Sequence, residues 1–585
     1  MFSRAVTSGL LTVSALALAA GVAYAGVVMD MVPVGDPGNA PDTRYATPGY
    51  GAVNYTYQIG KYEVTAGQYT EFLNDVAKTD TYGLYNTSMW NDTYGCKIQR
   101  SGTSGSYTYS VASDRADHPI NFVSFWDSCR FVNWLQNGQP TGLQNASTTE
   151  DGAYTLNGYT GNSGISIQRN SGAKWFLPSD NEWYKAAFYD PGKPGGAGYW
   201  DYPIRSNTEP KRESPPGTDL VNGSWNVNQV VGPPYYTTKV GAYSAKPSTS
   251  AYGTYDQGGN QGEWCDTNFA PGDTRRVLLC ACWGSAPPFY GARDRGGYYP
   301  NQEVADAAGI RVAALPQTYA ILVGSRAPGW DNQGNEFPDK VRGDLDVDHV
   351  SAKLTWASQK EVIIADWGGA DTLAARIQTS ANSILPKVKA GDTLFFYYSG
   401  HGNGNSGAGV DEELNAVNGG HYLDDTLTSL LSDSRLNDVK KRVILDSCRS
   451  GGFWNNDATS GDNDLETLSN IAFLAAATED TNALSDTDGT GLFTNSILPG
   501  LNAQTTFAQL ANLAATAHSG NVTGFFKVGG YGTVPWNPVS FTSGFDAART
   551  RLDGEMVPEP SALALLGVGA ISLLAYAWRR RKRAA

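Results

Sequence analysis

The chain carries little charge for its length, and most of that charge is negative. Of 585 residues only 17% are charged, and the formal net charge is −14. Phosphate groups are bound by basic surfaces, so this balance argues against nucleic acid as a partner. The six cysteines are too few and too scattered for a disulfide scaffold, and no CxxC pair indicates a structural zinc site.

Glycine and the large aromatic residues are plentiful instead. The chain has 67 glycines, 15 tryptophans and 32 tyrosines. It is too long for a single hydrophobic core, so we expect two or three domains. The composition suits a loop-rich exported protein better than a cytosolic helical one.

The first 25 residues have the pattern of a secretory signal. Arg4 supplies the positive start, residues 10–22 are an apolar stretch, and Ala23-Tyr-Ala25 is a small-x-small cleavage site. We therefore expect the mature chain to begin at Gly26. The alternative is a buried N-terminal helix.

Two apolar runs end at chemically reactive residues. Residues 393–399 predict a buried strand that stops just before His401, and residues 442–445 predict another that stops just before Cys448. In an open parallel sheet, functional residues collect beyond the carboxyl ends of the strands. We therefore expect the imidazole and the sulfur to share one edge. The alternative is a buried structural cysteine beside a core histidine.

This pair of side chains has the chemistry of a nucleophilic dyad. A thiolate is the reactive form of cysteine, and a neighbouring imidazole raises its fraction at neutral pH. The small residues Gly402, Gly451 and Gly452 leave backbone N–H groups open to a substrate carbonyl. We assign the oxyanion site to the N–H groups of Gly402 and Cys448.

The residues around the dyad resemble the caspase and metacaspase family of cysteine peptidases. The resemblance covers residues 316–535, and Arg449 stands where many relatives have a histidine. It implies that Cys448 is the nucleophile and His401 the general acid/base, with no cofactor needed for the dyad and Ca²⁺ as an open question. It also implies that the polar loop 455–470 can be a cleaved linker. The motifs are Tyr398-Ser-Gly-His401-Gly402, Asp446-Ser-Cys448-Arg-Ser-Gly451, Phe473-Leu-Ala-Ala-Ala and Gly491-Leu-Phe-Thr494.

Acidic residues near the dyad suggest a substrate preference. Asp446 lies two residues before the nucleophile, and Asp346 and Asp348 follow the first predicted strand, where metacaspases place an acidic pocket residue. Carboxylates in the pocket would favour arginine or lysine before the scissile bond. Solvated loop carboxylates are the alternative, and a preference for aspartate stays open.

The C-terminal half alternates strands and helices, which predicts an α/β domain with a mostly parallel sheet covered on both faces. A helix is expected around residues 347–354. The other expected strands are 319–324 and 361–365, and the other expected helices are 371–384, 424–431 and 507–517.

Residues 26–315 predict an irregular, loop-dominated α+β domain with helices at 65–76 and 124–135. Six spaced motifs resemble the formylglycine-generating-enzyme (sulfatase-modifying factor) family, which implies a C-type-lectin-like fold. These motifs are Tyr62-Glu-Val-Thr65, His118-Pro-Ile-Asn121, Trp126 with Asn133-Trp-Leu135, Phe176-Leu-Pro-Ser-Asp-Asn-Glu182-Trp183, Gly259-Asn-Gln-Gly-Glu263-Trp264 and Gly309-Ile-Arg-Val-Ala313.

The resemblance does not extend to the oxidase cysteines. The two positions expected to hold them fall near Ser285 and Tyr290, whereas Cys280 and Cys282 stand too early and only two residues apart. Two sulfurs must converge to bind copper, and residues i and i+2 of a strand are held about 7 Å apart. We therefore expect this domain to bind a glycan, a peptide or another protein.

Asp256, Asn260 and Glu263 offer a set of oxygen ligands. Such ligands suit Ca²⁺, and the resembling family places an ion near these residues. The alternative is a solvated polar turn.

The C-terminal tail follows a linker at residues 536–556. Residues 557–560, Val-Pro-Glu-Pro, precede an apolar run at 561–578 that is just long enough to span a bilayer, and Arg579–Arg583 follow. A basic cluster after the run should stay cytoplasmic. The tail resembles the PEP-CTERM sorting signal of Gram-negative bacteria, read by exosortase. A permanent single-pass anchor is the alternative.

Together these features predict an exported or membrane-anchored cysteine endopeptidase at the surface of a Gram-negative bacterium. Its N-terminal lectin-like domain is expected to bind a ligand or the substrate. The first alternative is a surface binding or adhesion protein whose caspase-like domain is inactive or processes only itself. The second is a formylglycine-type oxidase.

Overall fold

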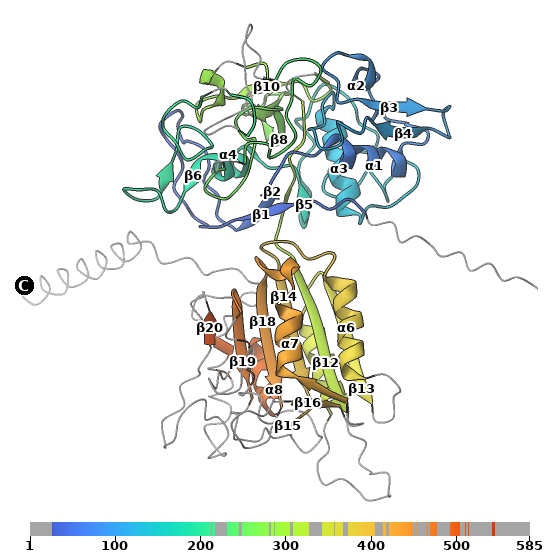
Figure 1. Ribbon diagram of the computed structural model, residues 1–585, viewed down its shortest axis with the longest axis vertical. Helices are drawn as coiled ribbons and strands as arrows, with labels where there is room; N and C mark the ends of the chain where they lie inside the picture. The colour runs from blue at the N-terminus through green and yellow to red at the C-terminus, as the bar shows by residue number, and fades with distance from the viewer. Residues whose placement is uncertain are drawn as a thin grey trace, which may run out of the picture.

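The structure is a computed structural model that shows two domains stacked end to end (Figure 1). The predicted signal, the apolar tail and nearly all of the predicted helix at 507–517 lie outside the described residues. Within the described part, no helix is long and apolar enough to cross a membrane. The described residues are 26–211, 213–216, 231–244, 249–279, 282–285, 287–304, 308–326, 342–355, 357–366, 372–403, 413–416, 420–447, 453, 465, 468–476, 492–502, 509–510, 513 and 541–543.

The longer helices of the N-terminal domain begin at capping residues. Helices α1 (Ala66–Val76) and α3 (Phe125–Gln136) confirm the two predicted helices, and a short α2 (Ser88–Asn91) lies between them. Helix α4 (Asp180–Phe188) was not predicted, although a capping box marks its start. The Ser179 hydroxyl accepts from the Glu182 backbone N–H, and the Glu182 carboxylate accepts from the Ser179 backbone N–H.

The strands of this domain are short and scattered. One sheet has the order β1-β2-β11-β5, so that β11, at the end of the domain, pairs with β2 near its start. A second sheet has the order β10-β9-β8, and β3-β4 and β6-β7 form hairpins. The strands are β1 Met31–Val34, β2 Tyr57–Gly60, β3 Ile98–Ser101, β4 Thr108–Val111, β5 Trp175–Phe176, β6 Tyr189–Asp190, β7 Gly198–Tyr199, β8 Glu263–Asn268, β9 Arg276–Leu279, β10 Gly296–Tyr298 and β11 Ala313–Ala314; a 3₁₀ helix, η1, covers Pro287–Tyr290.

A six-stranded sheet forms the second domain, in the order β13-β12-β14-β18-β19-β20. All neighbours are parallel except β19 and β20, which confirms the predicted, mostly parallel sheet. A small antiparallel sheet, β15-β16-β17, was not predicted. The strands are β12 Thr318–Arg326, β13 Gln359–Asp366, β14 Thr393–Ser399, β15 His401–Asn403, β16 Glu413–Ala416, β17 Gly420–Leu423, β18 Lys440–Asp446, β19 Ile471–Ala475 and β20 Phe541–Ser543.

Helices cover both faces of this sheet, as predicted. Helices α6 (Leu373–Ile384) and α7 (Asp424–Leu431) pack on one face, and α5 (Gly343–Lys353) and α8 (Leu492–Ile497) pack on the other. All seven residues of β14 are buried, and alternate side chains point to the two cores. Two 3₁₀ helices, η2 (Ser434–Leu436) and η5 (Leu498–Gly500), also belong to this domain.

The two domains meet where the parallel strands begin. Asp392, just before β14, accepts hydrogen bonds from the Gln58 side chain at 3.0 Å and from the Gln317 backbone at 2.7 Å. The Lys389 ammonium lies 4.2 Å from the centre of the Trp175 ring. The seven residues of β14 carry the chain about 20 Å to the opposite edge. The N-terminal domain therefore sits far from the edge that carries His401.

Candidate active site at the carboxyl edge of the parallel sheet

Strands β14 and β18 are hydrogen-bonded parallel neighbours, with Ser399 opposite Asp446. The Gly400 backbone N–H donates to the Asp446 carbonyl at 3.1 Å, so the pairing continues past the last strand residues. In the sequence, His401 comes two residues after Ser399, and Cys448 comes two residues after Asp446. The chain therefore exits β14 and β18 at neighbouring positions on the same edge of the sheet.

His401 opens the small antiparallel sheet at this edge. It is half-buried, begins β15 and pairs with Asn415, while Gly402 pairs with Leu414. The Tyr398 hydroxyl donates to the His401 carbonyl at 2.7 Å and fixes the turn between β14 and β15. The other residues predicted for the dyad and its oxyanion site, Cys448, Gly451 and Gly452, lie outside the described residues.

Helix α5 packs closely against this edge. A Cβ on Gly343 would lie 2.2 Å from the Ser399 carbonyl oxygen and 2.7 Å from that of Ser325, so only glycine allows this approach. The first turn of α5 thereby reaches the end of β14. There the Ser399 hydroxyl donates to Asp346 at 2.7 Å.

The predicted pocket aspartates of α5 occupy different environments. Asp346 is buried against Ser399, whereas Asp348 is exposed to solvent. Their neighbour Asp344 forms an ion pair with Arg342 at 2.9 Å. Of the two candidates, only Asp346 contacts the strand end that precedes His401.

Asp446 is also buried, with 3% of its surface exposed. Its carboxylate accepts from the Thr494 backbone at 3.0 Å and from the Thr494 hydroxyl at 2.6 Å, and Tyr397 shares that hydroxyl. Burial raises the pKa of Asp446 to about 6, against the opposing effect of Thr494. These partners could not be predicted from the sequence, because Thr494 lies 48 residues downstream of Asp446.

The predicted calcium ligands have protein partners. Both Glu263 oxygens accept from Arg311, at 2.7 and 2.8 Å. The Asn260 amide bonds Thr238 and Glu63, and Asp256 accepts from the Gly241 backbone at 2.6 Å.

The side chains of Asp256, Asn260 and Glu263 therefore form hydrogen bonds within the domain. Among the described residues, no group of three or more histidine, cysteine or acidic side chains is arranged to hold a metal. The Ca²⁺ site at these three residues stays a prediction.

The segment predicted to replace the oxidase cysteines is partly described. Cys282 is buried and its sulfur lies 3.3 Å from the Ser285 hydroxyl, and the Tyr290 hydroxyl donates to the Ser285 carbonyl. Cys280 lies outside the described residues. Near the two positions where the oxidases have cysteines, the chain thus has the hydroxyl of Ser285 and the phenol of Tyr290.

Comparison with known families gives three matches along the chain. Residues 29–315 match the sulfatase-modifying factor enzyme 1-like domain, residues 336–536 the caspase domain, and residues 557–582 the PEP-CTERM protein-sorting motif. Metacaspase-1 of Ajellomyces capsulatus is 28% identical over 206 residues, which cover 29% of this chain and 56% of the relative. Metacaspase-1A of Aspergillus oryzae is 33% identical over 86 residues, 13% of this chain and 20% of the relative.

The chain thus spans about half the length of the first of these relatives and a fifth of the second. Among solved structures, CarF is 19% identical with a TM-score of 0.31, covering 49% of this chain and 98% of CarF. Caspase-1 of Spodoptera frugiperda is 12% identical with a TM-score of 0.26, covering 35% of this chain and 77% of that protein. The family matches agree with the sequence motifs: in order along the chain, its segments are similar to the sulfatase-modifying factor enzyme 1-like domain, the caspase domain and the PEP-CTERM sorting motif.

Proposed function

We propose that this protein is an exported cysteine endopeptidase that uses a His401–Cys448 dyad. The observation that carries the proposal is the register of β14 and β18, in which Ser399 lies opposite Asp446. Since each proposed catalytic residue follows its strand end by two positions, this register supports a shared site. The caspase-domain match and the metacaspase relatives support the same class of chemistry.

In the proposed reaction, the Cys448 thiolate attacks the carbonyl carbon of the scissile peptide bond. The N–H groups of Gly402 and Cys448 stabilise the negative oxygen of the tetrahedral intermediate. The C–N bond then breaks, and His401 protonates the leaving amine. Water, deprotonated by His401, hydrolyses the thioester and returns the free cysteine with a carboxylic acid product.

The substrate proposal rests on the two buried carboxylates beside the strand ends. Asp346 contacts Ser399, and Asp446 contacts Thr494. Burial of both carboxylates in one region would stabilise a cationic side chain brought to it. We therefore propose cleavage after arginine or lysine, with Asp348 left in solvent and outside the pocket.

The proposal also covers where the protein is located and what its N-terminal domain does. The sorting motif at residues 557–582 supports export and exosortase-type processing, with the domains outside the cell. The N-terminal domain contacts the edge of the sheet opposite His401. It is therefore better placed to hold the enzyme at a target than to line its active site.

Fluorogenic peptides that differ only in arginine, lysine or aspartate before the scissile bond test this function. We expect cleavage of the basic peptides, and a loss of kcat/KM of at least about a thousandfold in Cys448→Ala and in His401→Ala. Cys96→Ala is the matched control, because Cys96 is buried in the N-terminal domain. Repeating the assay with added Ca²⁺ and with chelator tests the calcium question.

Cleavage that survives Cys448→Ala would reject the dyad. A folded protein that cleaves none of the peptides would favour the surface-binding alternative instead. Mass spectrometry of a cysteine-containing sulfatase peptide tests the oxidase alternative, for which we expect no loss of sulfur because Ser285 and Tyr290 stand at the cysteine positions.

A further inference from the structure

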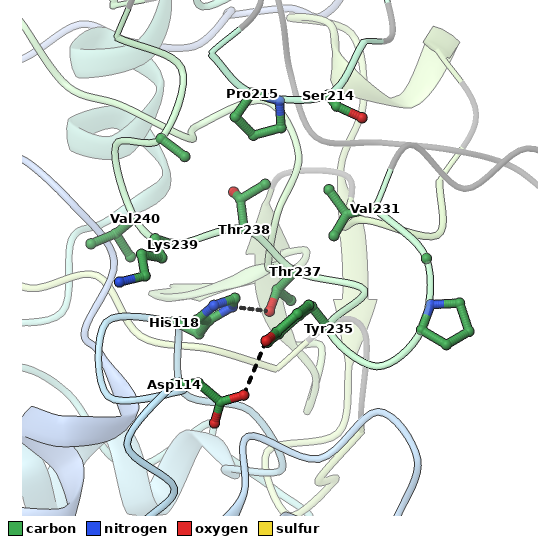
Figure 2. Close-up of a pocket in the computed structure, with 13 residues that line it drawn as sticks. Asp114, His118, Ser214, Pro215, Val231, Tyr235, Thr237, Thr238, Lys239 and Val240 are labelled. Carbon is green, nitrogen blue, oxygen red and sulfur yellow. Dashed lines mark hydrogen bonds between the residues drawn. The ribbon is translucent and has the colours of Figure 1, made fainter.

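The N-terminal domain contains an open cavity of about 770 Å³ that the peptidase chemistry does not use. Figure 2 shows side chains converging on it from two parts of the chain, residues 114–118 and 231–242, with Ser214 and Pro215 at one side. The volume lies in the range of small-molecule sites, about 300–1,000 Å³. The cavity is therefore large enough for an organic ligand.

Most of the wall surface is apolar. Pro215, Pro233, Val231, Val240 and Ala242 all line the cavity. Burying apolar ligand surface against such groups is favourable, at roughly 25 cal/mol per Å². A ligand with a largely apolar body would be complementary to this wall.

The polar groups of the floor are held by one another. The His118 ring lies 3.0 Å from the Thr237 hydroxyl and stacks on Tyr235, with 5.5 Å between the ring centres. The Tyr235 hydroxyl donates to Asp114 at 3.1 Å, as Figure 2 shows. The Thr238 backbone and hydroxyl both donate to Asn260. The polar groups of the floor are thus largely engaged in bonds within the domain.

The charges around the cavity disfavour an anion. Lys239 is paired with Asp117 at 3.1 Å. The Arg115 guanidinium lies 4.5 Å from the Tyr235 ring centre and bonds the Pro234 carbonyl. Burial and the neighbouring Arg115 and Lys239 lower the pKa of His118 to about 4, so its imidazole is neutral at pH 7. An anion would meet the Asp114 carboxylate, and the ammonium of the lining residue Lys239 is already paired with Asp117.

A carbohydrate also fits poorly. Sugars are bound by many polar side chains and by open aromatic faces, but the Tyr235 ring is already covered by His118 and Arg115. The polar side chains of the floor are engaged in the bonds described above.

We propose that this cavity binds a compact, uncharged and largely apolar small molecule, with its polar end toward Asp114 and His118. The proposal is independent of the peptidase function. It assigns the N-terminal domain a small-molecule ligand in place of the glycan or protein that its lectin-like sequence suggested. Ligand binding there would take place at a site built entirely from N-terminal-domain residues.

Photoaffinity labelling of the full chain in phospholipid nanodiscs tests the proposal. The probes are the neutral 3-trifluoromethyl-3-phenyldiazirine and its 4-carboxylate analogue, which differ by one negative charge. We expect the neutral probe to label peptides containing residues 114–118 and 231–242 in a saturable manner. The carboxylate should label them at least about tenfold less, because its charge would lie beside Asp114 and against a largely apolar wall. Mapping the labelled peptides distinguishes labelling of the cavity from labelling of chain segments that contact the lipid.

Two variants sharpen the test. Ala242→Trp fills the cavity and should abolish saturable labelling of those peptides, whereas Val28→Trp adds the same ring at a position that is 67% exposed and should change nothing. Asp114→Lys changes an exposed side chain and should raise labelling by the carboxylate probe about tenfold.

Equal labelling by the two probes would overturn the inference, and so would saturable labelling that persists in a folded Ala242→Trp protein. If Ala242→Trp does not fold, the Asp114→Lys result decides the matter. No gain of carboxylate labelling in that variant would contradict the charge argument.

Discussion

The two domains satisfy their buried polar groups by different means. In the C-terminal domain the parallel strands pair backbone with backbone, and β14 needs only a run of buried side chains. In the N-terminal domain the strands are short, so side chains take over this task. Arg311, for example, donates to the Gly60 and Tyr255 carbonyls as well as to Glu263.

This difference explains why the two domains are recognised by different kinds of sequence signal. A sheet core tolerates exchange among apolar residues as long as the pattern of burial is kept. A loop-rich core depends on particular polar side chains at particular places, because an unsatisfied buried group is costly. The N-terminal domain therefore carries spaced polar motifs, and the C-terminal domain carries apolar runs that end at reactive residues.

The largest expected effect comes from removing a buried cation of the N-terminal domain. Arg311→Met should cost at least about 3–5 kcal/mol, because it leaves the buried Glu263 carboxylate without its cationic partner, with the Trp183 indole as a remaining donor. The nearby Glu63 and Asp256 carboxylates add to the cost. The measurement is urea unfolding followed by tryptophan fluorescence. Arg435→Met is the control: its ion pair with Asp433 is largely exposed and should contribute less than about 1 kcal/mol. Equal costs would contradict the comparison.

An apolar truncation should have the next largest effect in the parallel sheet. Phe396→Ala removes a fully buried ring from β14, and we expect a loss of about 3–5 kcal/mol in the free energy of unfolding. Val362→Ala on β13, where Val362 is 45% exposed, should cost less than about 0.5 kcal/mol. Circular dichroism during urea unfolding checks both values. A loss below about 1 kcal/mol for Phe396→Ala would show that the sheet core is not the source of stability.

Asp446 connects stability with pH. Its folded pKa of about 6 lies above the usual value near 4, so the native state favours the protonated carboxyl. The corresponding stability is present below pH 4 and is lost as the pH rises through about 6. Asp446→Asn still accepts the Thr494 hydrogen bonds without a charge. We therefore expect it to be more stable than the wild type at pH 8, by up to about 3 kcal/mol, and equally stable near pH 4.

Thermal unfolding of Asp446→Asn and the wild type across this pH range measures the effect. Asp348→Asn is the control, because Asp348 is exposed on α5. A stability difference that does not change with pH would reject the argument from burial. Under the proposed function, Asp446→Asn should also weaken cleavage after arginine, whatever its effect on stability.

The smallest expected effects compare helix caps in the two domains. Ser179 caps α4 and exchanges bonds with Glu182, whereas Thr372 caps α6 with a single bond to the Ala375 backbone. Ser179→Ala should cost about 1–2 kcal/mol and Thr372→Ala about 0.5–1 kcal/mol. Calorimetric melting of each variant distinguishes the two. A larger loss for Thr372→Ala would contradict the dependence of the N-terminal domain on side-chain bonds.

Elements whose signal is local could be predicted from the amino-acid pattern alone. The apolar runs predicted β14 and β18, and helical spacing predicted α1, α3, α6 and α7, because burial periodicity is set by neighbours in the chain. The sequence did not predict α4, whose capping box lies within the motif at residues 176–183, or the sheet β15-β16-β17, whose strands are very short.

The environments of the charged side chains, in contrast, depend on the folded chain. Asp446 bonds Thr494, Glu263 bonds Arg311, and Gln58 reaches Asp392 across the domain boundary, with partners 48, 48 and 334 residues apart. Such pairings depend on how the chain is folded back on itself, and no spacing rule in the sequence encodes them. For this reason the sequence could nominate carboxylates for a pocket or an ion, while their burial and their partners came from the fold.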